Sequence, residues 1–88
     1  MSEVKLRNDA IEWREVEGQI VVLDVDAAEY LAINRTGAAI WPLITEGARR
    51  EDLAERLMAE YGIDKSSAAR DVEEFVTGLA ERGLLEKS

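Results

Sequence analysis

The first third of the chain contains short runs of β-branched and aromatic residues separated by turn-forming positions. Residues 13–16 form a short mixed run, residues 20–25 are largely β-branched, and residues 29–33 form a third short run. Glu17-Gly18 and residues 26–28 lie between these runs and predict tight turns. The pattern indicates an antiparallel meander of three strands. Such a small sheet needs helices on one face, because it is only marginally stable alone.

The rest of the chain has apolar residues at helical spacing, beginning after Asn34, which is a good N-cap residue. The first helix contains Pro42, and a proline inside a helix removes a backbone hydrogen bond and costs about 3 kcal/mol. We therefore expect this helix to kink or to end early, near Trp41, with Leu43 and Ile44 still packing inward.

Two further helices follow, each with caps that agree with its apolar stripe. The second is predicted over residues 50–61, with one face formed by Leu53, Leu57, Met58 and Tyr61. Gly62 suits the left-handed position after its last turn, and Ile63 supplies the apolar contact of such an ending. Asp64 then caps a third helix, which ends at Gly83. The buried stripe of this helix consists of Ala68, Val72, Phe75, Val76 and Leu79.

Strands followed by helices indicate an α+β fold, in which three helices cover one face of a three-stranded antiparallel sheet. This content resembles a winged helix-turn-helix with the sheet placed first. We expect residues 1–88 to form a single domain. The large residues available to its core are Trp13, Tyr30, Trp41, Tyr61 and Phe75.

The composition argues against most catalytic chemistry. The 88 residues include no Cys and no His, which rules out disulfides, thiolate nucleophiles and Cys or His zinc sites. Ser66-Ser67 lies at a helix start, where serines normally act as caps, and no His is present to serve as a base. Asp24, Asp26 and Glu29 lack the spacing of an EF-hand calcium loop. We therefore expect a binding module and not an enzyme, with no cofactor and no metal.

The charge restricts the class of partner. There are 11 basic and 19 acidic residues, which makes the formal net charge −8. An acidic surface repels phosphate, so nucleic acids and anionic membranes are poor partners. Residues 66–83 carry only Arg70 and Arg82 as basic residues, beside a larger number of acidic ones, and this disfavours entry into a DNA groove. No signal peptide or membrane-spanning run is visible, so we expect a cytoplasmic protein.

The outer strands of a three-stranded meander have free edges, and a free edge invites an added strand. One interpretation is that Glu29 and the shortness of the third strand blunt this edge. The other is β-augmentation, in which an extended peptide pairs with the edge and side-chain pockets provide specificity. The physical properties of the residues leave both interpretations open.

Several segments occur in the order of a known family. They are Gly18-Gln19-Ile20-Val21-Val22-Leu23-Asp24, Tyr30-Leu31-Ala32-Ile33-Asn34, Thr36-Gly37-Ala38, Ile40-Trp41, Leu53, Leu57, Tyr61-Gly62, Asp71-Val72, Phe75, Leu79 and Gly83-Leu84-Leu85. With this set, which covers nearly the whole chain, the protein resembles the PqqD-like family of RiPP recognition elements. It is most similar to the stand-alone leader-binding proteins of lasso-peptide biosynthesis. Pro42 departs from the family pattern and puts the packing of the first helix in doubt, but not the function.

The resemblance implies a fold of three strands and three helices and a non-catalytic function. Members of the family bind the leader segment of a ribosomally made precursor peptide as an extra strand on the third strand, against the third helix. They deliver the precursor to processing enzymes, which in lasso-peptide clusters are a leader peptidase and then a cyclase. Lasso leaders carry a Tyr-x-x-Pro pattern, whose Tyr and Pro fill apolar pockets of the groove.

Carried onto this sequence, the resemblance implies a leader-binding site on the third strand and the third helix. Its residues are Glu29, Tyr30, Leu31, Ala32 and Ile33 on the strand, and Asp71, Glu74, Phe75 and Gly78 on the helix. By strand alternation Leu31 and Ile33 face the helices, and we expect Phe75 to line an apolar pocket.

Two of these assignments have ordinary structural alternatives. Gly78 either lets the peptide approach closely or is a tolerated surface glycine. Asp71 and Glu74 either meet basic leader residues or are solvated helix positions. The alternative to the whole assignment is an acidic, winged-helix-like interaction or regulatory domain without a leader-peptide ligand.

Overall fold

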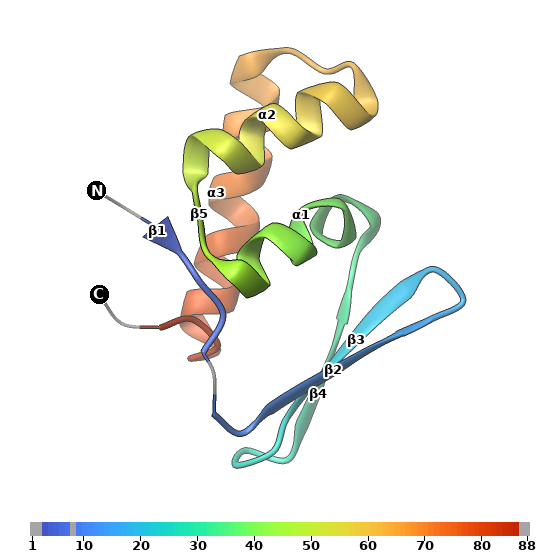
Figure 1. The fold of residues 1–88 in the computed structure, drawn as a ribbon, viewed down its shortest axis with the longest axis vertical. Coiled ribbons are helices and arrows are strands. Elements are labelled where there is room, and N and C mark those ends of the chain that lie inside the picture. Colours follow the sequence, from blue (N-terminus) through green and yellow to red (C-terminus); the bar gives the residue numbers. More distant parts are fainter. Residues whose placement is uncertain (1–2, 8, 87–88) are drawn as a thin grey trace.

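A three-stranded antiparallel sheet and three helices make up most of the fold (Figure 1). The structure is a computed structural model that describes residues 3–7 and 9–86. In chain order the elements are β1 (Glu3–Val4), β2 (Ile11–Val16), β3 (Gln19–Asp24), β4 (Glu29–Ile33), α1 (Arg35–Glu46), β5 (Ala48–Arg49), α2 (Arg50–Tyr61) and α3 (Lys65–Glu81). The predicted α+β fold is therefore confirmed, with two additional two-residue strands.

The sheet has the strand order β2-β3-β4, and both pairings are antiparallel. Ile20 lies opposite Ile33, and Val22 lies opposite Leu31. Because side chains alternate across a strand, these residues share the face that the helices cover. Ile20, Val22 and Ile33 are buried there, and Leu31 is half-buried. Strand β4 forms one edge of the sheet.

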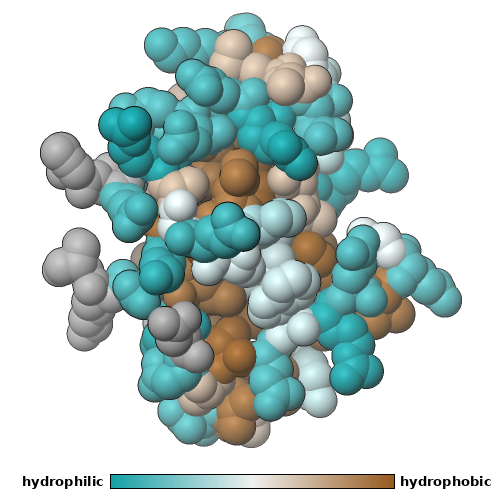
Figure 2. Space-filling view, in the orientation of Figure 1, coloured by the Kyte–Doolittle hydropathy of each residue, from teal (hydrophilic) through white to brown (hydrophobic). Residues whose placement is uncertain are grey.

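The core lies where the helices meet one another and the covered face of the sheet. Its largest fully buried side chains are Trp41, Ile40, Ile44, Leu53, Leu57, Leu79, Leu84, Val22, Val72 and Val76. Figure 2 shows one face of the molecule, on which hydrophilic side chains cover much of the surface and apolar side chains are visible between them, near the centre and at the lower edge. All the predicted stripe residues of α2 and α3 except Tyr61 therefore belong to the core or to its margin, where Met58 and Phe75 lie.

Each of the three helices has a predicted cap at one of its ends. The Asn34 side chain accepts a hydrogen bond from the Gly37 N–H at 2.7 Å, and the Asp64 side chain accepts one from the Ser67 N–H at 2.9 Å. Gly62 adopts the left-handed conformation at φ 65° and closes α2. Local sequence thus places the helix boundaries correctly here.

Of the two outcomes expected at Pro42, a kink or an early end, the early end of α1 near Trp41 is wrong. The helix passes through Pro42 and continues to Glu46. Pro42 is exposed, whereas Trp41 and Ile44 beside it are fully buried. We attribute the continuation to tertiary packing, because burial of large side chains on both sides of a proline offsets the loss of one backbone hydrogen bond.

The expected aromatic core is also wrong for three residues. Trp13 is 44% exposed, Tyr30 is 71% exposed and Tyr61 is 41% exposed. Tyr30 lies on the outer face of the sheet, one position before Leu31, so alternation points it away from the helices. Trp13 belongs to the edge strand β2, and its ring meets that of the buried Trp41 edge-on at a centroid distance of 5.9 Å.

An N-terminal strap, residues 3–7, was not predicted from the sequence. Strand β1 pairs with β5, and Leu6 forms an isolated bridge with Leu85. Val4 and Leu6 are buried in the core. Two-residue strands are too short to show alternation, so only their partners elsewhere in the chain reveal them.

Across the described ranges 3–7 and 9–86, none of the helices is both long and apolar enough to cross a membrane.

Candidate functional site

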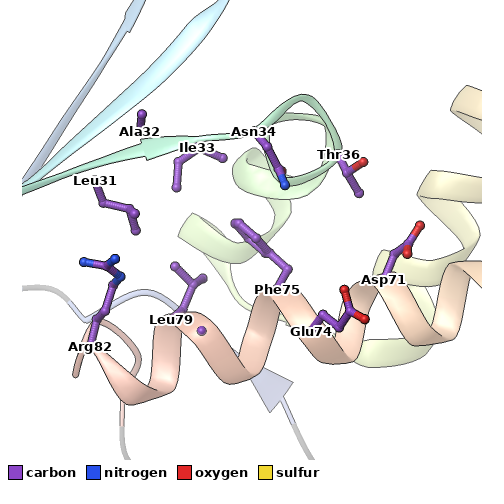
Figure 3. A pocket seen from close by; sticks show the side chains of 11 residues that line it. Leu31, Ala32, Ile33, Asn34, Thr36, Asp71, Glu74, Phe75, Leu79 and Arg82 are labelled. Atoms are coloured by element: carbon purple, nitrogen blue, oxygen red, sulfur yellow. The ribbon is translucent and has the colours of Figure 1, made fainter.

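A groove of about 370 Å³ runs between strand β4 and helix α3 (Figure 3). One wall comes from the end of β4 and the start of α1, and consists of Leu31, Ala32, Ile33, Asn34 and Thr36. The other wall comes from α3 and the residue after it, and consists of Asp71, Glu74, Phe75, Gly78, Leu79 and Arg82. Strand and helix pack here because both present apolar residues to the same core.

The apolar part of the groove is built around the ring of Phe75. This ring is half-buried and lies against α1 at Gly37. A Cβ atom at Gly37 would lie 2.6 Å from Phe75 Cζ and 2.8 Å from Ile33 Cγ2. Since real Cβ atoms do not approach other atoms so closely, only glycine at this position lets the Phe75 ring rest between β4 and α1. Packing against Phe75 therefore explains the glycine of the Thr36-Gly37-Ala38 segment.

The charged side chains of the groove are divided between its two ends. Asp71 and Glu74 lie toward the end where α1 begins, near Thr36, and Arg82 lies at the opposite end, beside Leu31 (Figure 3). The groove is therefore acidic at one end and basic at the other, with apolar side chains between.

A free backbone edge accompanies the groove. Strand β4 pairs with β3 on one side, and the part of the chain that the structure describes places no strand on its other side. An edge strand has N–H and C=O groups directed outward without sheet partners. The site therefore combines a line of backbone hydrogen-bonding groups with side-chain pockets.

The structure brings together most of the residues expected at the site, but not Glu29 or Tyr30. Tyr30 projects from the outer face of the sheet, and Glu29 lines a smaller hollow beyond the Arg82 end. The residues that the sequence analysis missed are Asn34, Thr36, Leu79 and Arg82. Arg82 is four positions after Gly78, so it lies on the same side of the helix one turn later. This spacing in the sequence would have identified Arg82 as a groove residue.

Other candidate chemistry has structural explanations. The Asp24 carboxylate accepts a hydrogen bond from the Ala27 N–H at 3.2 Å and lies 3.5 Å from Arg7 Nη2, so it closes a turn. Within residues 3–7 and 9–86, no group of three or more acidic side chains is placed to hold a metal ion.

Two solved structures are similar to this chain over nearly its whole length. One is TbiB1 in complex with the TbiA(beta) leader peptide, with 30% sequence identity and a TM-score of 0.86 over 97% of this chain and 98% of the other. The second is lasso peptide synthetase B1 complexed with the leader peptide, with 31% identity and a TM-score of 0.82 over 94% and 96% of the two chains.

The family comparison agrees with the structural one. No curated protein matches the chain significantly. Residues 19–85 match the family model described as coenzyme PQQ synthesis protein D (PqqD), and this range includes β3, β4, all three helices and the groove. The family resemblance noted in the sequence is therefore confirmed, and the chain belongs to the PqqD family.

Proposed function

We propose that this protein is an adaptor that binds the leader segment of a ribosomally made precursor peptide, of the lasso type, as an added β-strand along β4. The observation that carries this proposal is the free edge of β4 beside a groove lined by α3. Both similar structures hold leader peptides, which supports the same class of ligand here.

The groove suggests a role for each side chain in leader binding. Leu31, Ile33 and Phe75 offer apolar surface to the Tyr and Pro of a Tyr-x-x-Pro leader. Asp71 and Glu74 attract basic leader residues, and the net charge of −8 speeds their capture at low salt. The backbone of β4 supplies the strand pairing.

We further infer that the protein performs no chemistry on the bound precursor. The absence of Cys and His from the sequence removes the Cys–His and Ser–His pairs that many peptidases use. In this proposal the adaptor presents the precursor to a leader peptidase, and the peptidase product passes to a cyclase.

Fluorescence polarisation with a labelled Tyr-x-x-Pro leader tests the proposal directly. We expect the wild type to bind with a Kd between about 1 μM and 1 nM, typical of a strand pairing with a few filled pockets. Phe75→Ala and Leu31→Asp should each weaken binding by at least about 30-fold, the size of a hot-spot loss. Val16→Asp is the matched control, because Val16 is exposed on β2 at the opposite edge of the sheet.

Amide hydrogen exchange distinguishes strand addition from side-chain binding alone. Adding the leader should slow exchange of the outward amides of residues 29–33, while the free edge of β2 stays unchanged. If several such leaders fail to bind at tens of micromolar, the leader assignment is wrong. The winged-helix-like interaction domain without a leader ligand then becomes the better hypothesis.

A further inference from the structure

We infer that the two charged ends of the groove set the direction and register of the bound leader, an inference that rests on the proposed function. The leader carries a basic side chain at the Asp71 and Glu74 end and an acidic side chain at the Arg82 end. The two side chains lie four residues apart, with the basic one nearer the leader N-terminus.

Among the residues that the structure describes, no ion pair occupies the opposite charges of the groove. Within residues 3–7 and 9–86, the salt bridges are Arg7 with Asp9 and Asp24, Arg50 with Glu73, and Arg56 with Glu60. None of these pairs involves Asp71, Glu74 or Arg82. Glu29 shares a small hollow with Arg82 but forms no ion pair with it at 4.0 Å or less. A bound peptide can therefore satisfy both ends.

The spacing follows from the geometry of helix and strand. Glu74 and Arg82 are eight positions apart along α3 and its C-cap, which corresponds to about 12 Å at the helical rise. An extended strand covers that distance in about four residues. Residues four apart in a strand also point to the same side, so both charged side chains of the leader can face α3.

The direction follows from the strand order. Strand β4 runs from Leu31, beside Arg82, toward Asn34, near the acidic end (Figure 3). Every pairing in the existing three-stranded sheet is antiparallel, and antiparallel pairing is slightly more stable than parallel. An antiparallel leader therefore begins at the Asp71 and Glu74 end. A basic residue followed four positions later by an acidic one then matches both ends.

Three Tyr-x-x-Pro leaders of equal length test this inference by fluorescence polarisation. They carry Lys-x-x-x-Glu, Glu-x-x-x-Lys or Gln-x-x-x-Gln at the two positions that would face α3, and all three have the same net charge. The wild type should bind the Lys-first leader at least about tenfold more tightly than the Glu-first leader, with the neutral leader between. Because the three leaders have the same net charge, attraction to the protein's net charge of −8 cannot by itself produce this order.

A charge-swapped groove provides the reciprocal measurement. The double variant Glu74→Lys with Arg82→Glu keeps the net charge. Asp71 still opposes the lysine placed at position 74. The preference should therefore reverse toward the Glu-first leader mainly through the acidic residue at position 82, and the reversed preference should be smaller than that of the wild type. Arg56→Glu with Glu60→Lys is the matched control, since it swaps an ion pair on α2 outside the groove and should leave the order unchanged.

The outcomes separate this inference from the proposed function. Equal binding of all three leaders to the wild type overturns the inference and leaves leader binding intact. Tighter binding of the Glu-first leader also overturns it, because the strand would then run parallel to β4. Failure of the neutral leader and both charged ones to bind overturns the proposed function as well. If the charge-swapped variant does not fold, the binding of the three leaders to the wild type still tests the inference.

Discussion

Two glycines that lie at the groove occupy opposite environments. Gly37 in α1 has no room for a Cβ atom, because Phe75 and Ile33 already fill that space. Gly78 in α3 has no atom within 4 Å of where its Cβ would lie, other than its own helix. The first glycine is therefore required by packing. Gly78 is not required by packing, although a glycine inside a helix lowers the stability of the helix.

Substitution of each glycine by alanine should change stability in opposite directions. Gly37→Ala overpacks the contact with Phe75 and should lower the free energy of unfolding by about 1–3 kcal/mol. Gly78→Ala adds a good helix former at an open site and should raise it by up to about 1 kcal/mol. Urea unfolding followed by tryptophan fluorescence measures both changes, and a stable Gly37→Ala variant would contradict the packing described here.

The Gly78→Ala variant also separates the two interpretations of this residue. If Gly78 lets the leader approach closely, the added methyl group should weaken leader binding while stabilising the fold. If it is a tolerated surface glycine, leader binding should equal that of the wild type.

Among the elements, helix α3 supplies one wall of the groove. The first turn of this helix is stabilised by its N-cap residue, Asp64. Hydrogen bonds from Ser67 to the Asp64 carboxylate lower the pKa of Asp64. The side chain of Ser67 has the larger effect, and its backbone N–H has the next largest. The folded protein therefore favours the ionised carboxylate more than the unfolded chain does. This contribution is complete above the ordinary pKa of 3.8 and is lost as the pH falls through the lowered value.

Substitution of Asp64 should therefore reduce stability in a pH-dependent manner. Asp64→Ala should lower the urea midpoint at neutral pH, and its difference from the wild type should shrink at about pH 3 and below. Asp64→Asn keeps a capping oxygen without the charge, so it should retain most of the stability at neutral pH and lose less in acid. A constant difference between wild type and Asp64→Ala across this pH range would exclude a charge contribution.

At the scale of the whole molecule, the N-terminal strap joins distant parts of the chain. The Leu6 N–H donates to the Ile44 carbonyl at 2.9 Å, and the Arg7 N–H donates to the Leu84 carbonyl at 2.8 Å. Leu6 itself is only 7% exposed. The strap therefore ties the end of α1 to the segment that follows α3.

Removal of the Leu6 side chain should destabilise the whole fold. Leu6→Ala leaves a cavity under the strap and should cost about 2–4 kcal/mol in urea unfolding. Val25→Ala is the control, because Val25 is 46% exposed and its truncation should change stability by no more than about 0.5 kcal/mol. A Leu6→Ala variant as stable as this control would mean that the strap does not contribute to the cooperative core.

Local spacing in the sequence predicts the three strands of the main sheet, the three helices and the caps at Asn34, Gly62 and Asp64. These features depend on neighbouring residues, such as Asp64 with Ser67 or the apolar stripe from Leu53 to Leu57, so local spacing reveals them. It also placed Leu31 and Phe75 on elements that face one another.

The folded structure adds the contacts that residues make across elements. It buried Trp41 and left Tyr30 exposed, carried α1 through Pro42, and paired β1 with β5. It also placed Arg82 at the end of the groove opposite Asp71. The burial of Trp41, the passage of α1 through Pro42 and the pairing of β1 with β5 depend on contacts between residues far apart in the chain, where burial and packing outweigh local preference. Tyr30 and Arg82 differ, because strand alternation and helical spacing in the sequence already indicate where they lie.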